Sequence, residues 1–266
     1  MATGSLPEEG ELRLGSIILP AGKRIHAGYD PAIPVTWVTR QAVPDAGRVW
    51  AALSAAHPDT GLVPFLLGIL PGDPARPWDT GEFSIPAYPA QPGHAGAAEV
   101  LADRWDGEMP SDEEVDEDDD EWAAMRAPFS RQFPGLAPAG DTPLSPRQLD
   151  QTLGSLPAAR IGLVQATRPP DVLPLIGWTP SDQSDALPVA TIVRSWEDRF
   201  GARLLEVGFA QISLLAGRPP RSTGHAQRIA AEHFAFCDEC AGQGLSDIPH
   251  ITASLMQTPI WTFWWD

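Results

Sequence analysis

The chain has 266 residues, of which 43% are hydrophobic, so it is long and apolar enough for one large domain or two of ordinary size. Its 35 Asp and Glu residues outnumber its 18 Lys and Arg residues, which gives a formal net charge of −17 at pH 7. This charge repels phosphate backbones and anionic lipids, so we expect neither nucleic acid nor a membrane as a direct partner, whereas a basic protein would be attracted.

No segment has the features of a membrane span or a secretory signal. The longest nearly continuous apolar stretch, residues 62–70, contains Pro64 and is far shorter than the roughly 20 residues that cross a bilayer. The first residues lack both the basic and the apolar region of a signal peptide. Because only two cysteines are present, Cys237 and Cys240, we expect no disulfide framework and predict a cytoplasmic protein.

The N-terminal part, residues 1–106, has the patterns of a smaller, Pro-rich α/β unit. β-Branched and aromatic residues at 35–43 predict a strand, and Asp45 is placed to cap the helix that follows it. The apolar stretch 62–70 is typical of a buried strand, and residues 95–105 predict a second helix.

Residues 107–145 differ in composition from both flanks. From Asp112 onward, nine of ten residues are acidic, and a stretch rich in Pro and Gly follows. Like charges repel each other and keep such a run solvated. We therefore expect this segment to be a connector between two folding units.

The C-terminal domain, residues 146–266, has the clearest pattern. We expect strands at residues 160–166, 203–207, 211–215 and 260–265. We expect helices at residues 189–200, 222–236 and 247–256. The first helix is the most regular, because its apolar residues recur at helical spacing. This order predicts an α/β or α+β fold in which helices pack on a mixed sheet.

Six blocks of this domain resemble one protein family. The blocks are Arg160 to Val164, Gly177 and Trp178, Arg194 to Ala202, Arg218 to Pro220, Ala231 to Cys237, and Trp261 to Asp266. Together they are similar to the bacterial family, common in actinobacteria, called domain of unknown function 4253, over residues 158–266. The resemblance implies a bacterial cytosolic protein with this domain as its defining part. It implies no activity, substrate or catalytic residue.

The pair Cys237 and Cys240, with His233 one turn earlier, raises the question of zinc or of thiol–disulfide chemistry. A structural zinc site needs four ligands, and only His250 is available to complete one. A redox-active pair is favoured by a helix N-terminus, which stabilises a thiolate, whereas this pair follows the end of a predicted helix. We therefore expect buried or half-buried thiols, no metal and no cofactor.

Aromatic and charged residues concentrate in the C-terminal domain. Tryptophan together with arginine is typical of binding hot spots, although tryptophans also fill cores. We expect most of these rings in the core, with one or two left to line a groove that has a charged rim. The candidate groove residues are Trp178, Arg194, Trp196, Glu197, Arg199, Trp261 and Trp265.

Two functions are compatible with these features. The first is an acidic cytosolic protein-binding module, an adaptor or an inhibitor of a basic protein, which uses the aromatic groove. The alternative is an enzyme of unknown reaction that uses Glu197, Glu232 or His233 as acid or base. His233 shares a predicted helix face with Ile229 and Phe236, where a histidine is more often a hydrogen-bonded core residue than a base. Since no nucleophile, phosphate-binding or dinucleotide motif supports an enzyme, we favour the binding module.

Overall fold

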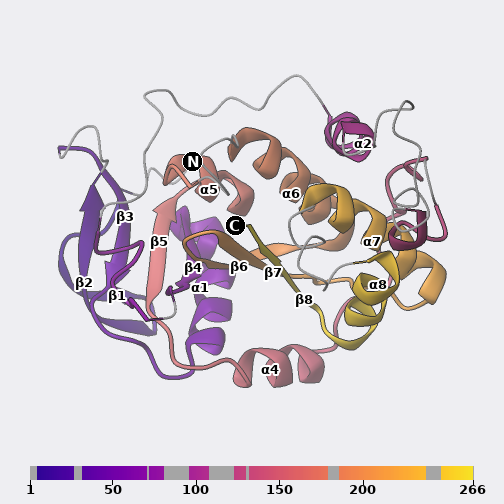
Figure 1. Cartoon of the computed structure of the whole chain (residues 1–266). Coiled ribbons are helices and arrows are strands. Elements are labelled where there is room, and N and C mark those ends of the chain that lie inside the picture. The colour runs from indigo at the N-terminus through magenta and orange to yellow at the C-terminus, as the bar shows by residue number, and fades with distance from the viewer. Residues whose placement is uncertain are drawn as a thin grey trace.

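A computed structural model of the chain describes residues 5–26, 32–70, 72–80, 96–107, 123–129, 132–178, 186–237 and 247–265. Within these residues, one mixed sheet of eight strands has helices on both of its faces (Figure 1). This arrangement confirms the predicted fold class.

The sheet runs through the whole chain. Its strands are β1 (Gly10–Leu14), β2 (Ile17–His26), β3 (Pro34–Thr39), β4 (Leu62–Leu67), β5 (Ile161–Gln165), β6 (Arg203–Val207), β7 (Gln211–Leu215) and β8 (Ile260–Trp264). Their spatial order is β1-β2-β3-β5-β4-β6-β7-β8, so β1 and β8 are the edges. β4 and β6 are parallel, and the other neighbouring pairs are antiparallel.

The helices form a layer on each side of the sheet. They are α1 (Ala46–Thr60), α2 (Ala97–Gly107), α4 (Pro146–Gly154), the 3-10 helix η1 (Pro169–Asp171), α5 (Val172–Leu175), α6 (Ala186–Phe200), α7 (Thr223–Phe236) and α8 (Ile248–Gln257). α1 and α4 belong to the smaller of two hydrophobic cores, and α2 and α5 to α8 belong to the larger one. None of the helices in the described ranges has the length and apolar character that crossing a membrane requires.

The alternation of side chains along the strands explains why there are two cores. In β4, Val63, Phe65 and Leu67 belong to the larger core, whereas Leu66 belongs to the smaller one. Both faces of this strand are apolar, as expected for a strand that is covered on both sides. Phe65 packs closely on β5 because Gly162 has no side chain, since a β-carbon there would lie 2.3 Å from the Phe65 ring.

Two helix starts show how far local signals determine the structure. Ser222 caps α7, with its hydroxyl oxygen accepting from the backbone N–H of His225 at 3.4 Å, and this cap agrees with the predicted helix start. Asp45 also precedes a helix as predicted, but its side chain makes no cap hydrogen bond. Its backbone has a left-handed φ of 50°, so it acts as a turn residue instead.

The strands β1 and β2 and the helix α4 are absent from the sequence-based prediction. Pro20 and Gly22 argue against a strand where β2 lies. The structure makes use of Gly22, because a β-carbon there would lie 2.1 Å from the ring of Trp37 on β3. α4 is short, and it begins with a capping box in which Ser145 and Gln148 exchange side-chain and backbone hydrogen bonds.

The sheet joins the two parts of the chain that the sequence separates. β5 lies between β3 and β4 and pairs with both, and β4 in turn pairs with β6. A unit made of residues 1–106 would have β3 and β4 without the strand between them. The division into residues 1–106 and 146–266 therefore does not describe the sheet. The acidic run from Asp112, which marks the expected connector, lies outside the described residues.

We predict that residues 146–266 expressed alone do not fold, because β5 would lose both of its neighbours and β6 would lose β4. Circular dichroism and amide NMR dispersion of this fragment, compared with the full chain, measure the outcome. If the fragment unfolds cooperatively, as two separate folding units require, then the shared sheet is not needed for folding of the C-terminal part.

Candidate functional site

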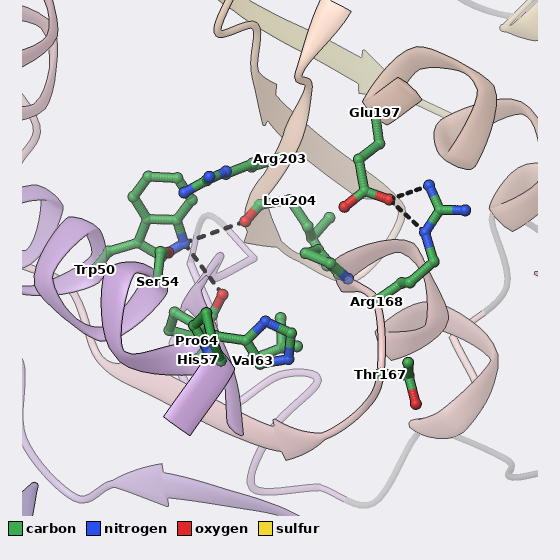
Figure 2. A pocket seen from close by; sticks show the side chains of 12 residues that line it. Trp50, Ser54, His57, Val63, Pro64, Thr167, Arg168, Glu197, Arg203 and Leu204 are labelled. Carbon is green, nitrogen blue, oxygen red and sulfur yellow. Dashed lines mark hydrogen bonds and ion pairs between the residues drawn. The ribbon is translucent and has the colours of Figure 1, made fainter. Parts of the chain in front are cut away.

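A cavity of about 220 Å³ lies at the end of the sheet where β5 ends and where β4 and β6 begin. Its polar or aromatic lining side chains include Trp50, Ser54 and His57 of α1, Thr167 and Arg168 after β5, Glu197 of α6 and Arg203 of β6. Figure 2 shows the α1 side chains on one side and Arg168 with Glu197 on the other. The cavity therefore combines both parts of the chain.

Trp50 links two of the strands that surround the cavity. Its indole Nε1 donates to the backbone oxygens of Pro64 on β4 and Leu204 on β6, each at 3.1 Å. Proline has no N–H to offer a neighbouring strand, so the indole supplies a donor between β4 and β6 at this point. The ring is almost completely buried. Trp50 is thus a fixed part of the cavity wall.

His57 lies in the last turn of α1 and is oriented by one hydrogen bond. Its Nε2 lies 2.9 Å from the backbone oxygen of Ala166, just after β5. A carbonyl oxygen only accepts, so Nε2 carries a proton, and in the neutral ring Nδ1 is an acceptor. Ser54 lies one turn earlier on α1. This helix therefore contributes an imidazole and a hydroxyl group to the cavity.

Arg168 and Glu197 form an ion pair in the cavity wall. Arg168 Nε donates to Glu197 Oε2 at 2.8 Å, and Arg168 Nη2 donates to Asp198 Oδ1 at 2.6 Å. The Arg168 side chain is 36% exposed, so water screens the pair, which orients the two side chains more than it stabilises the fold. The carboxylate of Glu197 is therefore already neutralised by a neighbour.

Arg203 brings a second guanidinium group to the cavity. It is the first residue of β6 and is exposed, and its side chain has no hydrogen-bond or ion-pair partner in the described parts of the chain. Figure 2 shows this side chain extended beside the Trp50 indole. Arg168 is neutralised by Glu197 and Asp198, so Arg203 contributes a cationic group to the cavity lining that no carboxylate of the described residues offsets.

The predicted aromatic groove does not form beside Glu197: none of its four tryptophans lines that cavity, and Trp261 instead lines a separate cavity against α7 and α8. Trp178 and Trp196 are fully buried, and Trp261 and Trp265 are only 2% and 4% exposed. Trp196 stacks on Phe263 with ring centroids 5.3 Å apart, and Trp178 meets Trp265 edge to face at 5.6 Å. These rings fill the larger core between the helices and β8. Core packing, the alternative use of such residues, therefore accounts for them.

The charged candidates of the groove are separated from one another. Each takes part in its own ion pair: Arg194 with Asp171, Arg199 with Glu232, and Glu197 with Arg168. Of the predicted groove residues, Glu197 alone lines the cavity described above.

Glu232 is a fully buried carboxylate whose two oxygens are both occupied by donors. Oε1 accepts from the Ala137 backbone N–H at 2.6 Å and from Arg199 Nη1 at 2.7 Å. Oε2 accepts from Trp196 Nε1 at 2.8 Å and from Arg199 Nη2 at 2.6 Å. Such a bidentate pair is strong and well oriented. Glu232 thus holds α7 against α6 and the segment at Ala137, which is a structural role.

His233 is a core residue, as its helix face predicts. It is 6% exposed, and its ring lies 4.8 to 4.9 Å from the rings of Trp196, Trp261 and Phe263. Burial, together with the nearby Arg199 cation, lowers the pKa of His233 to about 3. The ring is therefore neutral at physiological pH. Contrary to the expectation of a hydrogen-bonded histidine, its Nε2 has no partner within the described residues.

Cys237 differs from the prediction of a free thiol. It is buried at the end of α7 and is disulfide-bonded. The prediction of a thiol is therefore wrong at this position, and Cys240 lies outside the described residues. Among the residues that the structure describes, no three His, Cys, Asp or Glu side chains come together in a way that could hold a metal ion.

Sequence reasoning misses most of the cavity. Ser54 and His57 lie in the part of the chain that was expected to fold separately, so no sequence pattern connects them with Glu197. Arg168 has a detectable signal, because it lies two residues after the predicted strand 160–166 and polar residues in such connections frequently line binding sites. Arg203 looks like an ordinary first residue of a strand, and no signal distinguishes it.

The fold and the cavity together define an α/β protein with a small polar cavity at one end of its sheet. Residues 160–266 match the model of the family described as Domain of unknown function (DUF4253), which confirms the resemblance found in the sequence. The match spans the C-terminal part of the chain, from β5 to β8. No curated protein and no solved structure matches the chain.

We predict that Glu232→Gln lowers the free energy of unfolding by about 3 kcal/mol, because the half-buried Arg199 loses its counter-charge. The matched substitution Glu9→Gln, in the exposed pair with Arg40, should change it by less than about 1 kcal/mol. Urea unfolding of both variants measures the difference. Equal effects would show that the buried pair is not a specific stabilising contact.

We also predict that His233 makes the fold sensitive to acid. Its pKa is about 3 in the folded state and near 6.5 in the unfolded state, so between these values the unfolded chain binds one more proton. The part of the free energy of unfolding that depends on neutral His233 is complete above pH 6.5, and it is lost as the pH falls toward 3. Between pH 7 and pH 5, the free energy of unfolding of the His233→Gln variant should fall by about 2 kcal/mol less than that of the unsubstituted protein. Urea unfolding at both pH values tests this. The control is His250→Gln, at an exposed position, and its free energy of unfolding should fall as much as that of the unsubstituted protein.

Proposed function

We propose that the protein is a binding module that recognises an anionic group, a carboxylate or a phosphate, in the cavity beside Glu197. The proposal depends on one observation, namely that the Arg203 side chain lines this cavity without an ion-pair partner among the described residues. A guanidinium group offers five donors in a planar arrangement that matches the oxygens of carboxylates and phosphates. The hydroxyl groups of Ser54 and Thr167 are further hydrogen-bonding partners in the same lining.

The size of the cavity favours a small occupant. Its volume of about 220 Å³ is below the range of roughly 300–1,000 Å³ that is typical of sites for drug-sized ligands. An Asp or Glu side chain of a partner protein, or a small free anion, has a suitable size. We favour a protein partner of basic overall charge. The net charge of −17 would attract it over long distances, and one of its exposed carboxylates would bind locally to Arg203.

The enzyme alternative has less support in the contacts of its three candidate residues. Glu197 lies in the cavity, but Arg168 already occupies its carboxylate. Glu232 has no oxygen left for a proton, and His233 lies in the core with its pKa lowered to about 3. A general acid or base needs access to a substrate proton. Action in the cytoplasm of a bacterium stays a prediction from the sequence.

NMR titration of the full chain tests the anion site. We expect succinate, inorganic phosphate and the peptide acetyl-Ala-Glu-Ala-amide to shift the indole N–H resonance of Trp50 saturably, and the neutral peptide acetyl-Ala-Gln-Ala-amide not to do so. Arg203→Gln should raise the Kd for the anions about tenfold or more, because a charge-assisted contact is lost.

Arg221→Gln is the matched control, since Arg221 is exposed and does not line the cavity. This variant should bind the anions like the unsubstituted protein. Equal affinities of the Arg203 and Arg221 variants, or no saturable shift with any of the anions, would refute the proposal. Tighter binding of phosphate than of the acidic peptide would point to a free metabolite instead of a protein partner.

A further inference from the structure

Some backbone N–H and C=O groups of the edge strand β8 point away from its neighbour β7. Two hydrogen bonds flank its pairing with β7: Trp265 N–H donates to Ala210 O, and Ala216 N–H donates to Pro259 O, both at 2.9 Å. In an antiparallel pair, alternate residues direct both backbone groups to the partner strand. By this alternation Trp261 and Phe263 face β7. The backbone groups of residues 260, 262 and 264 point to the open edge.

Two contacts agree with this assignment. The backbone N–H of Ile260 donates to the hydroxyl of Thr258 at 3.2 Å instead of to β7. The backbone oxygen of Trp264 lies 3.0 Å from the sulfur of Cys237, on the side away from β7. Thr262, between these two residues, has its N–H and C=O directed outward. Neither group has a hydrogen-bond partner in the described parts of the chain, so the edge is open at this residue.

A second cavity lies against this part of the edge. It has a volume of about 210 Å³ and is bounded by α7, α8 and four consecutive residues of β8, Ile260 to Phe263. Its apolar lining includes Ile251 and Leu255. Two lining residues, His233 and Trp261, are more than nine-tenths buried, and each has a ring nitrogen with no partner among the described residues. Buried polar atoms without partners are rare in folded proteins.

We propose that an extended peptide segment of a partner protein adds to the free edge of β8, exchanges backbone hydrogen bonds with Thr262 and places an uncharged side chain with a hydrogen-bond acceptor in this cavity. An N–H and a C=O on one edge residue are the complement of another strand's backbone, which gives affinity, while the cavity selects the side chain. The site shares no lining residue with the cavity beside Glu197, so it does not depend on the function proposed above.

The shape of the site favours a single peptide over a second copy of the chain. Because α8 and β8 both bound the cavity, an incoming strand must lie between a helix and the sheet edge. The β8 strand of a second copy has its own α8 directly before it in sequence, joined by residues 258 and 259 alone. That helix would have to enter the same narrow space. A free peptide carries no such helix.

Proline at position 262 provides a specific test. Thr262→Pro removes the outward N–H and leaves the hydrogen bonds to β7, since proline is tolerated on an edge strand where its nitrogen faces away from the sheet. Thr262→Val is the matched control, because it also loses the hydroxyl but keeps the N–H. The probe is acetyl-Thr-Val-Gln-Val-Thr-amide, whose central side chain is uncharged and offers an acceptor; it is added to the full chain and followed by amide NMR and hydrogen exchange.

We expect the peptide to slow exchange of the Thr262 amide at least tenfold and to bind the Val variant within twofold of the unsubstituted protein. The Pro variant should bind at least tenfold more weakly while its Tm stays close to that of the Val variant. Equal binding by the Pro variant, absence of binding at millimolar peptide, or a dimer formed through β8 would each overturn the proposal. Arg203→Gln should leave peptide binding unchanged, which separates this test from that of the anion site.

Discussion

The position of β5 between β3 and β4 is the constraint on which the rest of the structure depends. This strand pairs with β3 through Trp37 and Val38 and with β4 along its whole length. It therefore fixes how the N-terminal strands meet the part of the chain that begins at residue 160. The end of β5 also places Arg168 opposite α1, so the same strand that joins the two parts builds the cavity between them.

Only some of the residues that line the cavity lie within the part of the chain that the family model matches. The matched residues 160–266 supply Arg168, Glu197 and Arg203, while Trp50, Ser54 and His57 come from outside the match. The domain alone thus contains the charged half of the cavity without the helix that faces it. The buried network around Glu232, in contrast, joins matched residues to the backbone of Ala137. Both features show that the domain relies on the residues before it.

The sequence predicts most of the sheet but only part of the site, and the reason is physical. Buried strands such as β4 and the amphipathic α6 carry their periodicity within a few residues, so they are readable locally. The cavity forms where segments far apart in sequence meet, as His57 and Glu197 do, and periodicity contains no information about that meeting. The tryptophans are ambiguous for a different reason. Trp196 has the composition signal of a hot spot, but its indole donates to the buried Glu232, and this contact is visible only in the fold.

The order of strands also has a consequence for synthesis of the chain. β4 is apolar on both faces and leaves the ribosome well before β5, its neighbour, because almost one hundred residues separate them. At translation rates of about 5–20 residues per second, β4 stays without β5 for on the order of ten seconds. During that interval its unpaired edges and hydrophobic side chains are exposed to other nascent chains. Until β5 has been synthesised, β4 is therefore an aggregation-prone segment of the nascent protein.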